Sequence, residues 1–215
     1  MLASSLLAAI LACAATGASA GAQVEDALSA NVQNSLHRSV SDYPAPNLVF
    51  ENDVEGLSWL ADMSSRLASK IGDWPTRRDF LVSVQYEATR AGLDPQLVLG
   101  LIEHESNFRK YAVSGAGARG YMQVMPFWVR QIGNDGHDLF TLRTNLRYGC
   151  TILRYYLDVE KGDLYRALGR YNGSLGRGEY PTAVLASMQR NWKWSSATNT
   201  GAGAFSLQLG AVVVR

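Results

Sequence analysis

The stretch of residues 97–126 reads LVLGLIEHESNFRKYAVSGAGARGYMQVMP, and it decides the fold of this chain. Leu97, Leu101 and Glu105 follow one another at intervals of four, which places them on one side of an α-helix. Asp94 is a good cap for the start of this helix, and the proline after it suits the first helical position. The helix therefore carries a carboxyl group where its apolar side would otherwise continue with a leucine.

This carboxyl group makes Glu105 the candidate catalytic residue. Burial beside apolar groups disfavours the charged form and raises the pKa, which lets a glutamic acid hold a proton near neutral pH and donate it. Glu103 lies on another side of the helix, and we predict that it is the solvated member of the pair. The helical pattern alone does not separate a general acid from a buried glutamate that pairs with an Arg or Tyr for structure only.

Composition narrows the class of protein. The chain has 215 residues, and 20 Lys and Arg stand against 19 Asp and Glu, for a net charge of +1. This length suits one domain with extra segments. So small a basic excess argues against nucleic acid as the main ligand.

The N-terminal segment predicts export from the cytoplasm. Residues 2–15 are mostly apolar and rich in Ala, and residues 18–20 read Ala-Ser-Ala, so we predict a signal peptide over 1–20, although no Lys or Arg precedes the apolar run. Cys13 follows Ile-Leu-Ala, which is similar to the lipobox of bacterial lipoproteins. Lipidation at Cys13 would make the protein an outer-membrane lipoprotein instead of a soluble exported one. The apolar run is too short and too rich in small residues to predict a membrane span.

The Gly-rich run at 114–120 permits tight, positive-φ backbone close to a ligand. It lacks the following Lys-Ser or Lys-Thr of a phosphate-binding loop, so we expect no nucleotide. Cys150 is the only cysteine left after removal of the signal peptide, and its apolar neighbours predict a buried, unreactive thiol. His137 is predicted to be a solvated loop residue. We predict no cofactor and no bound metal.

Helical spacing recurs along the chain, while strand signals are weak, so the predicted fold class is mainly α. We predict helices over 54–71, 76–91, 123–132, 142–159, 164–170 and 180–194, in addition to the one that begins at 95. Tyr171 and Asn172 are placed in a turn directly after a helix. The expected organisation is a partly ordered leader over 21–53, one domain over 54–194 and a disordered tail over 195–215.

Three motifs occur in a fixed order: Glu-Ser at 105–106, GARGYMQVMP at 117–126, and Tyr-Asn at 171–172. With them the chain resembles the soluble-type lytic transglycosylases, relatives of goose-type lysozyme, over about 93–194. The resemblance implies a lysozyme-like, mainly α domain with little or no β-structure. It also implies a monomeric enzyme in the periplasm whose partner is the peptidoglycan glycan strand.

The resemblance implies a role for each motif residue. The glutamate of the Glu-Ser pair is the catalytic acid and matches Glu105. The remaining residues set the site or contact the sugar: Ser106, Met122, Gln123, Tyr171 and Asn172. Met122 and Gln123 are expected to line the sugar groove, and Tyr171 to lie near the glutamate carboxyl, while Asn172 holds the turn. The chain departs from the family pattern at Tyr121, where Leu is usual, and at Arg170, where Ala is usual.

The mechanism that the resemblance implies needs only one carboxyl group. Glu105 protonates the oxygen that links N-acetylmuramic acid to N-acetylglucosamine, and it then takes the proton of the C6 hydroxyl as a 1,6-anhydro ring closes without water. Ordinary glycosidases use two carboxyl groups, and no second one shares a motif with Glu105. The alternatives are a hydrolytic, lysozyme-type muramidase and a non-catalytic murein-binding protein.

Arg119 is the open question within the decisive stretch. It is either a solvated loop cation or a partner of Glu103 or Glu105. A close pair with Glu105 would lower the pKa of that carboxyl and argue against its role as an acid.

Overall fold

The computed structural model describes residues 23–41 and 44–195, and its regular secondary structure there is helical. The elements are α1 (Ala30–Ser41), α2 (Asp53–Leu67), α3 (Trp74–Arg90), α4 (Pro95–Ser106), α5 (Phe127–Ile132), α6 (Leu142–Val159), α7 (Leu164–Asn172), α8 (Glu179–Ser187) and the π-helical turn η1 (Met188–Trp192). Extended pairing within these ranges consists of two isolated bridges, Val113 with Arg119 and Arg119 with Val124. The predicted mainly α fold class is confirmed.

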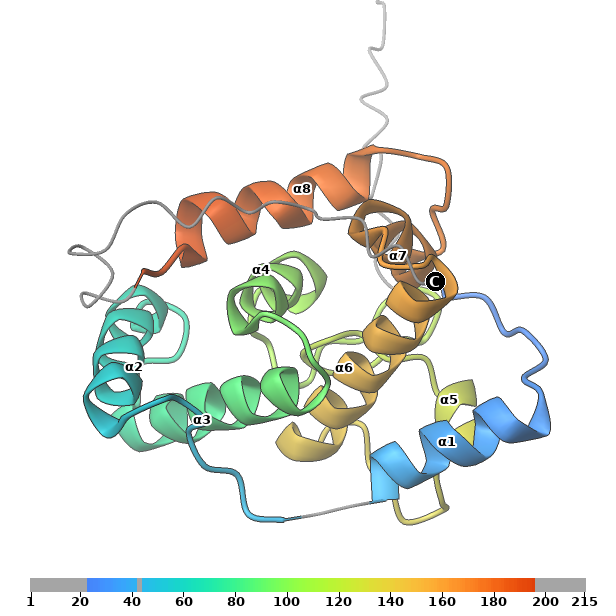
Figure 1. Ribbon diagram of the computed structural model, residues 1–215, viewed down its shortest axis with the longest axis horizontal. Helices are drawn as coiled ribbons and strands as arrows, with labels where there is room; N and C mark the ends of the chain where they lie inside the picture. The colour runs from blue at the N-terminus through green and yellow to red at the C-terminus, as the bar shows by residue number, and fades with distance from the viewer. Residues whose placement is uncertain (1–22, 42–43, 196–215) are drawn as a thin grey trace, which may run out of the picture.

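Helix α4 is the centre of the fold (Figure 1), and it packs against α8, η1 and α3. Most of its residues are buried, including Leu97, Leu101 and Glu105. Gly100 allows α8 and η1 to approach closely, because a Cβ atom there would lie 2.9 Å from the backbone nitrogen of Met188. The central position of α4 follows from its apolar surface, which is stable only when it is buried against other helices.

The start of α4 is the one that the sequence predicts. Asp94 caps it, with the carboxylate accepting a hydrogen bond of 2.8 Å from the backbone N–H of Gln96, and Pro95 is its first residue. The start of α3 is earlier than predicted. Asp73 is the cap, and its side chain accepts from the backbone N–H of Thr76 at 2.9 Å, so Thr76 lies inside the first turn.

The end of α7 differs from the prediction as well. Tyr171 and Asn172 form the last turn of this helix instead of a turn that follows it. The helix ends at Gly173, which adopts the left-handed conformation with φ of 73°. Glycine takes up this conformation at little cost, so the helix continues until it reaches one.

Helix α1 lies within the segment predicted as a leader. Leu36 and Val40 are buried, and the helix packs on α6 and α5. Gln33 adds a 2.6 Å hydrogen bond to the backbone carbonyl of Gln131. The folded body therefore includes residues on both sides of the predicted boundary at 53–54.

The predicted signal peptide, its Cys13 and the tail beyond residue 195 lie outside the described residues. Among the helices that the structure describes, none combines the length and the hydropathy that crossing a bilayer requires.

Candidate active site

Glu105 occupies the last turn of α4, and its side chain is 5% exposed. One carboxyl oxygen, Oε1, accepts a hydrogen bond from the hydroxyl of Tyr180. The other, Oε2, has no hydrogen-bond partner among the described residues. Burial raises the pKa of the Glu105 carboxyl to about 8, and the hydrogen bond from Tyr180 opposes that rise. Glu105 is therefore a protonated acid at neutral pH, as its place on the apolar side of the helix predicts.

Tyr180 is a site residue that the sequence does not reveal. It lies in the first turn of α8, 75 positions after Glu105, and belongs to none of the three motifs. Burial and the neighbouring Glu105 both raise the pKa of its hydroxyl, which keeps that hydroxyl a hydrogen-bond donor. The ring of His104 packs edge-on against Tyr180 with 5.1 Å between centroids. The position of the acid thus depends on α8 as much as on α4.

Changing Tyr180 to Phe is expected to raise the pKa of Glu105 further, because the hydroxyl that stabilises the carboxylate is removed while the ring still packs. A ¹³C NMR titration of the Glu105 carboxyl measures the change. Tyr165→Phe is the matched control, since the Tyr165 hydroxyl donates to the carbonyl of Gly178 at 2.9 Å and not to the acid. A lower or equal Glu105 pKa in Tyr180→Phe would show that this hydrogen bond does not act on the acid.

Glu103 is partly buried and is the more exposed of the two glutamates, as predicted, but it is bound by protein donors and is not free in solvent. Its Oε2 accepts three hydrogen bonds, from the Ser187 hydroxyl, from Asn191 Nδ2 at 2.8 Å and from Trp192 Nε1 at 2.9 Å. Partial burial raises the pKa of Glu103, but the three donors and Lys70 outweigh it, and the pKa is lowered. Two glutamates two positions apart are thus held in opposite states, and Glu103 joins α4 to the end of α8 and to η1.

Met122 and Gln123 are both buried, at 0% and 2% exposure. The Gln123 side chain donates to the backbone carbonyls of Ala112 at 3.1 Å and Gly120 at 3.0 Å. The backbone N–H of Met122 donates to Asn145 at 2.8 Å. Neither side chain presents an open surface to a sugar, and both hold the loop that follows Glu105 in shape.

Asn145, on α6, is the second residue that the sequence does not reveal. Its fully buried side chain accepts from Met122 N–H and donates to the carbonyls of Arg119 and Leu139, both at 2.8 Å. A Cβ atom at Gly120 would lie 2.4 Å from Asn145 Nδ2, and the φ of Gly120 is +75°. The glycine of this motif is therefore needed for the close approach of Asn145 and for its own backbone conformation.

The other motif residues are also buried. The Tyr171 hydroxyl donates to the carbonyl of Met122 at 2.8 Å. Burial raises the pKa of the Tyr171 hydroxyl, and the nearby Glu105 carboxylate raises that same pKa further. The Tyr171 ring therefore lies in the electrostatic field of the acid. The Ser106 hydroxyl donates to the Ile102 carbonyl within α4, and Asn172 ends α7. The structure thus joins Tyr171 to the loop of Met122, close enough to Glu105 for the acid to act on its pKa.

Arg119 does not pair with Glu105. Its guanidinium lies 5.9 Å from the centre of the Phe140 ring, and within the described ranges no ion pair joins it to either glutamate of α4. The pKa of Glu105 is shifted by burial and by Tyr180 alone. The arrangement that would have argued against the acid role is therefore absent from the described part of the chain.

The surroundings of two side chains outside the motifs, Cys150 and His137, were also predicted. Cys150 is fully buried, so its predicted burial is confirmed, and burial raises the pKa of its thiol, which disfavours the reactive thiolate. His137 is half-buried and its Nδ1 lies 2.7 Å from the Tyr148 hydroxyl, so it is less solvated than predicted. Residues 23–41 and 44–195 hold no cluster of three or more His, Cys, Asp or Glu that could bind a metal ion.

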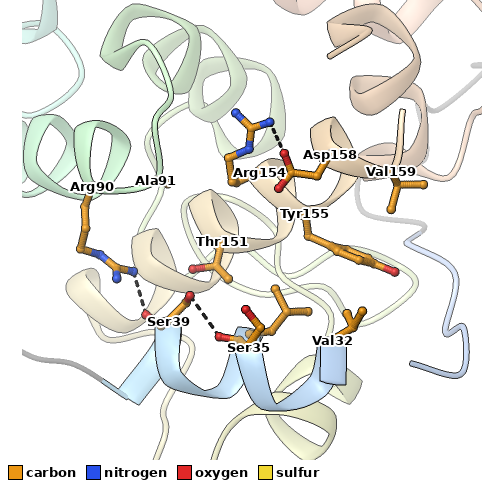
Figure 2. Close-up of a pocket in the computed structure, with 11 residues that line it drawn as sticks. Val32, Ser35, Ser39, Arg90, Ala91, Thr151, Arg154, Tyr155, Asp158 and Val159 are labelled. Carbon is orange, nitrogen blue, oxygen red and sulfur yellow. Dashed lines mark hydrogen bonds and ion pairs between the residues drawn. The ribbon is translucent and has the colours of Figure 1, made fainter. Parts of the chain in front are cut away.

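A cavity of about 520 Å³ lies away from these residues, between α1, the end of α3 and α6 (Figure 2). Arg90 and Arg154 line it, but Arg90 bonds to the carbonyl of Ser39 and Arg154 pairs with Asp158. None of the candidate site residues borders it. Cavity size therefore does not identify the chemistry of this chain, whereas the buried acid does.

Comparison with known proteins gives a consistent result. Residues 83–204, more than half of the chain, match the family described as the Transglycosylase SLT domain. Curated relatives include proteins named membrane-bound lytic murein transglycosylase C. The one from Actinobacillus pleuropneumoniae serotype 5b is 34% identical over 132 residues, and the one from Haemophilus influenzae is 30% identical over 131. Each alignment covers 59% of this chain and 32% of the relative, so the chain spans about a third of the length of these relatives.

Proposed function

Because this chain belongs to the Transglycosylase SLT domain family, we propose that it is a peptidoglycan lytic transglycosylase. It cleaves the β-1,4 bond from N-acetylmuramic acid to N-acetylglucosamine and leaves a 1,6-anhydromuramic acid end. The observation that supports this most is Glu105, a buried acid with a pKa of about 8 inside the region that matches the family. The curated relatives are named for the same activity.

In the proposed mechanism one residue acts twice. Protonated Glu105 donates its proton to the glycosidic oxygen, and the bond from that oxygen to C1 of N-acetylmuramic acid breaks while the neighbouring N-acetyl group stabilises the developing cation. The carboxylate of Glu105 then takes the proton from the C6 hydroxyl, and the C6 oxygen bonds to C1. A pKa near the working pH suits both steps, because the acid must give up a proton and regain one.

The surrounding residues have positioning roles in this proposal. Tyr180 orients one oxygen of the acid, and the second, buried oxygen has no hydrogen-bond partner among the described residues. Met122, Gln123 and Tyr171 hold the loop beside the acid through their buried contacts, and Ser106 and Asn172 fix the ends of the helices that carry the site.

A hydrolytic muramidase on the same scaffold is the main alternative. Such enzymes use a second carboxylate to activate water or to act as a nucleophile. No second carboxylate contributes to the pKa of Glu105 in the part of the chain that is described, and Glu103 is bound to three donors from α8 and η1. This favours a mechanism in which the substrate supplies the nucleophile.

The rate of fragment release from purified murein sacculi, as kcat/KM, is expected to fall as pH rises through about 8. The raised pKa of Glu105 keeps the acid protonated below that pH, and deprotonation above it removes the proton that the first step needs. Turbidity loss measured from about pH 5 to about pH 10 tests this. An alkaline limb with an apparent pKa near the ordinary value of 4.5 would contradict it, and a complete lack of release would favour the murein-binding alternative.

We also propose that the chain is exported to the periplasm, where its substrate lies. Whether Cys13 is lipidated decides between a soluble form and an outer-membrane lipoprotein. The relatives named as membrane-bound favour the lipoprotein. Labelling with a radioactive fatty acid, compared between the natural chain and Cys13→Ala, decides between them. Label in the natural chain alone identifies the lipoprotein, and label in neither identifies the soluble form.

A further inference from the structure

Two aromatic rings and two cations form a strip on the surface of the loops beside Glu105. The strip consists of Lys110, Tyr111, Arg119 and Phe140. The rings of Tyr111 and Phe140 pack with 5.8 Å between centroids. Lys110 lies 5.1 Å from the centre of the Tyr111 ring, and Arg119 lies 5.9 Å from the centre of the Phe140 ring. Each ring therefore has a cation beside it.

Burial in the core does not account for most of this strip. Tyr111 is 71% exposed and both cations are exposed, while Phe140 is partly buried. Single exposed aromatic residues are common on proteins, but a packed pair with a cation on each ring is a more specific feature. The strip leaves an aromatic surface and two positive charges available to a ligand.

The backbone beneath the strip is held rigidly. Arg119 exchanges two backbone hydrogen bonds with Val124, at 2.9 and 3.0 Å. Asn145 donates to the carbonyl of Arg119 and to that of Leu139, the residue before Phe140. One buried side chain thus fixes the two loop segments that carry Arg119 and Phe140, which preorganises the strip for binding.

The strip lies on loops that adjoin the helix end carrying Glu105. Lys110 and Tyr111 follow Glu105 by five and six positions, and the backbone N–H of Arg109 donates to the carbonyl of Ser106 at 3.1 Å.

The backbone N–H of Gly120, the residue before Tyr121, donates to the carbonyl of Ala112, the residue after Tyr111, at 2.9 Å, so the two loop segments are bonded to each other. Tyr121 precedes Met122, whose carbonyl accepts from Tyr171 in the field of Glu105. A glycan strand bound at the acid can therefore reach the strip along the same loop.

We propose that the strip of Lys110, Tyr111, Arg119 and Phe140 is a binding subsite for a sugar that carries a carboxylate. Sugar rings pack on aromatic faces, and Lys and Arg form charge-assisted hydrogen bonds with carboxylates. In peptidoglycan the carboxylate is either the lactyl group of N-acetylmuramic acid or that of an attached peptide. This inference rests on the proposed function, which identifies the glycan as peptidoglycan. It adds the two cations and the two aromatic rings of the strip to the residues that would recognise that glycan.

Binding measurements on the inactive Glu105→Gln chain test the subsite apart from turnover. The probes are glycan strands that retain their peptides, strands freed of peptide by an amidase, and neutral N-acetylglucosamine oligomers. The double variant Lys110→Gln, Arg119→Gln is expected to bind the carboxylate-bearing strands about tenfold more weakly, with less than about a twofold change for the neutral oligomers. A loss confined to peptide-bearing strands identifies a peptide carboxylate, because the lactyl carboxyl of those strands is tied up as an amide. A loss confined to the amidase-treated strands identifies the lactyl carboxylate, and an equal loss for both shows that the subsite accepts either carboxylate.

Matched controls exclude general effects of charge and of surface aromatic groups. Arg38→Gln, Lys193→Gln removes two exposed cations elsewhere, and Trp74→Ser removes an exposed ring that has Arg77 beside it at 5.7 Å. Neither is expected to change the affinity for any probe. Tyr111→Ser is expected to weaken binding of all three probes, because it removes the stacking surface.

Three outcomes would overturn the subsite: unchanged affinity in the Lys110, Arg119 double variant, an equal loss for neutral oligomers, or an equal loss in the control double variant. Thermal unfolding of each variant confirms that the chain is folded. The subsite and the proposed function fail in different ways. If the double variant loses binding selectively but the natural chain shows no turnover, the subsite stands and the proposed enzyme activity is rejected. If the natural chain turns over murein but binding in the double variant is not selectively lost, the activity stands and the subsite is rejected.

Discussion

Replacing Glu105 with Gln is expected to lower the release of fragments from murein by roughly a thousandfold, the scale of a general acid's contribution. Glutamine has nearly the same shape and can keep the hydrogen bond from Tyr180, but it has no proton to donate to a glycosidic oxygen. Binding of the glycan strand is expected to change little, because the loop and the strip are untouched. Fragment release by chromatography and strand binding measured side by side separate the two effects.

The same variant has a second expected effect, on stability. The pKa of Glu105 is raised from 4.5 to about 8 on folding, so the folded state favours the protonated acid. Its contribution to stability is fully present below pH about 4.5 and is lost as pH rises through about 8, by an amount on the order of a few kcal/mol. The amide of Glu105→Gln does not titrate, so the variant does not lose stability in this way. The melting temperature of the variant should therefore rise relative to that of the natural chain as pH increases.

Glu51→Gln is the control, since Glu51 is exposed and lies before α2. It should leave both turnover and the pH dependence of stability unchanged. Fragment release by Glu105→Gln at more than about a tenth of the natural rate would reject Glu105 as the proton donor. A melting temperature difference that does not depend on pH would reject its raised pKa.

Changing Asn145 to Ala is expected to cost about 3 kcal/mol or more of folding free energy. The substitution leaves one backbone N–H, that of Met122, and two carbonyls, those of Arg119 and Leu139, without their buried partner. Each unsatisfied group costs roughly 1–3 kcal/mol, less whatever water can restore. Turnover should fall as well, because the loop beside Glu105 loses the side chain that holds it.

Urea unfolding measures the free energy for Asn145→Ala and for its control, Asn47→Ala. Asn47 is exposed, and its side chain donates one bond of 3.3 Å to the carbonyl of Leu48. The control is expected to change stability by less than about 0.5 kcal/mol. A cost below about 1 kcal/mol for Asn145→Ala would show that the loop does not depend on that side chain.

The helices could be predicted from the sequence where their signals are local. Asp94 and Pro95 mark the start of α4, and the apolar residues of α6 repeat with helical spacing over its whole length, so both were predicted correctly. Helix α1 was not predicted, although Val32, Leu36 and Val40 recur every four positions. A short repeat between proline-containing and polar segments is a weak signal, and the surface that covers it belongs to α6, which is distant in the sequence.

The state of each glutamate could be predicted only in part. The burial of Glu105 follows from its own helix, but Tyr180, which bonds to it, is 75 positions away. Glu103 was expected to be the solvated member of the pair because it is rotated away from Leu101 on the helix. The donors that hold it come from positions 84 to 89 further along the chain. Local spacing predicts which side of a helix a residue occupies, and it cannot predict which distant side chain will meet it.

The motifs predict which helices and loops form the site more reliably than they predict which residues are exposed at its surface. Met122 and Gln123 fall in the loop next to the acid, as the resemblance predicts, but both are buried. The backbone N–H of Met122 is held by Asn145 of α6, which belongs to no motif. Tyr111 and Arg119 are among the exposed residues of the same loops, and the sequence offered no sign that they lie beside Phe140.

The most direct test of the account is the chemical form of the released ends. Murein sacculi are digested with the natural chain in water enriched in ¹⁸O, and the fragments are analysed by mass spectrometry. A lytic transglycosylase with Glu105 as its single acid releases fragments that end in 1,6-anhydromuramic acid and contain no ¹⁸O. Fragments with reducing ends that carry one ¹⁸O atom would show that water is the nucleophile, and they would contradict the account.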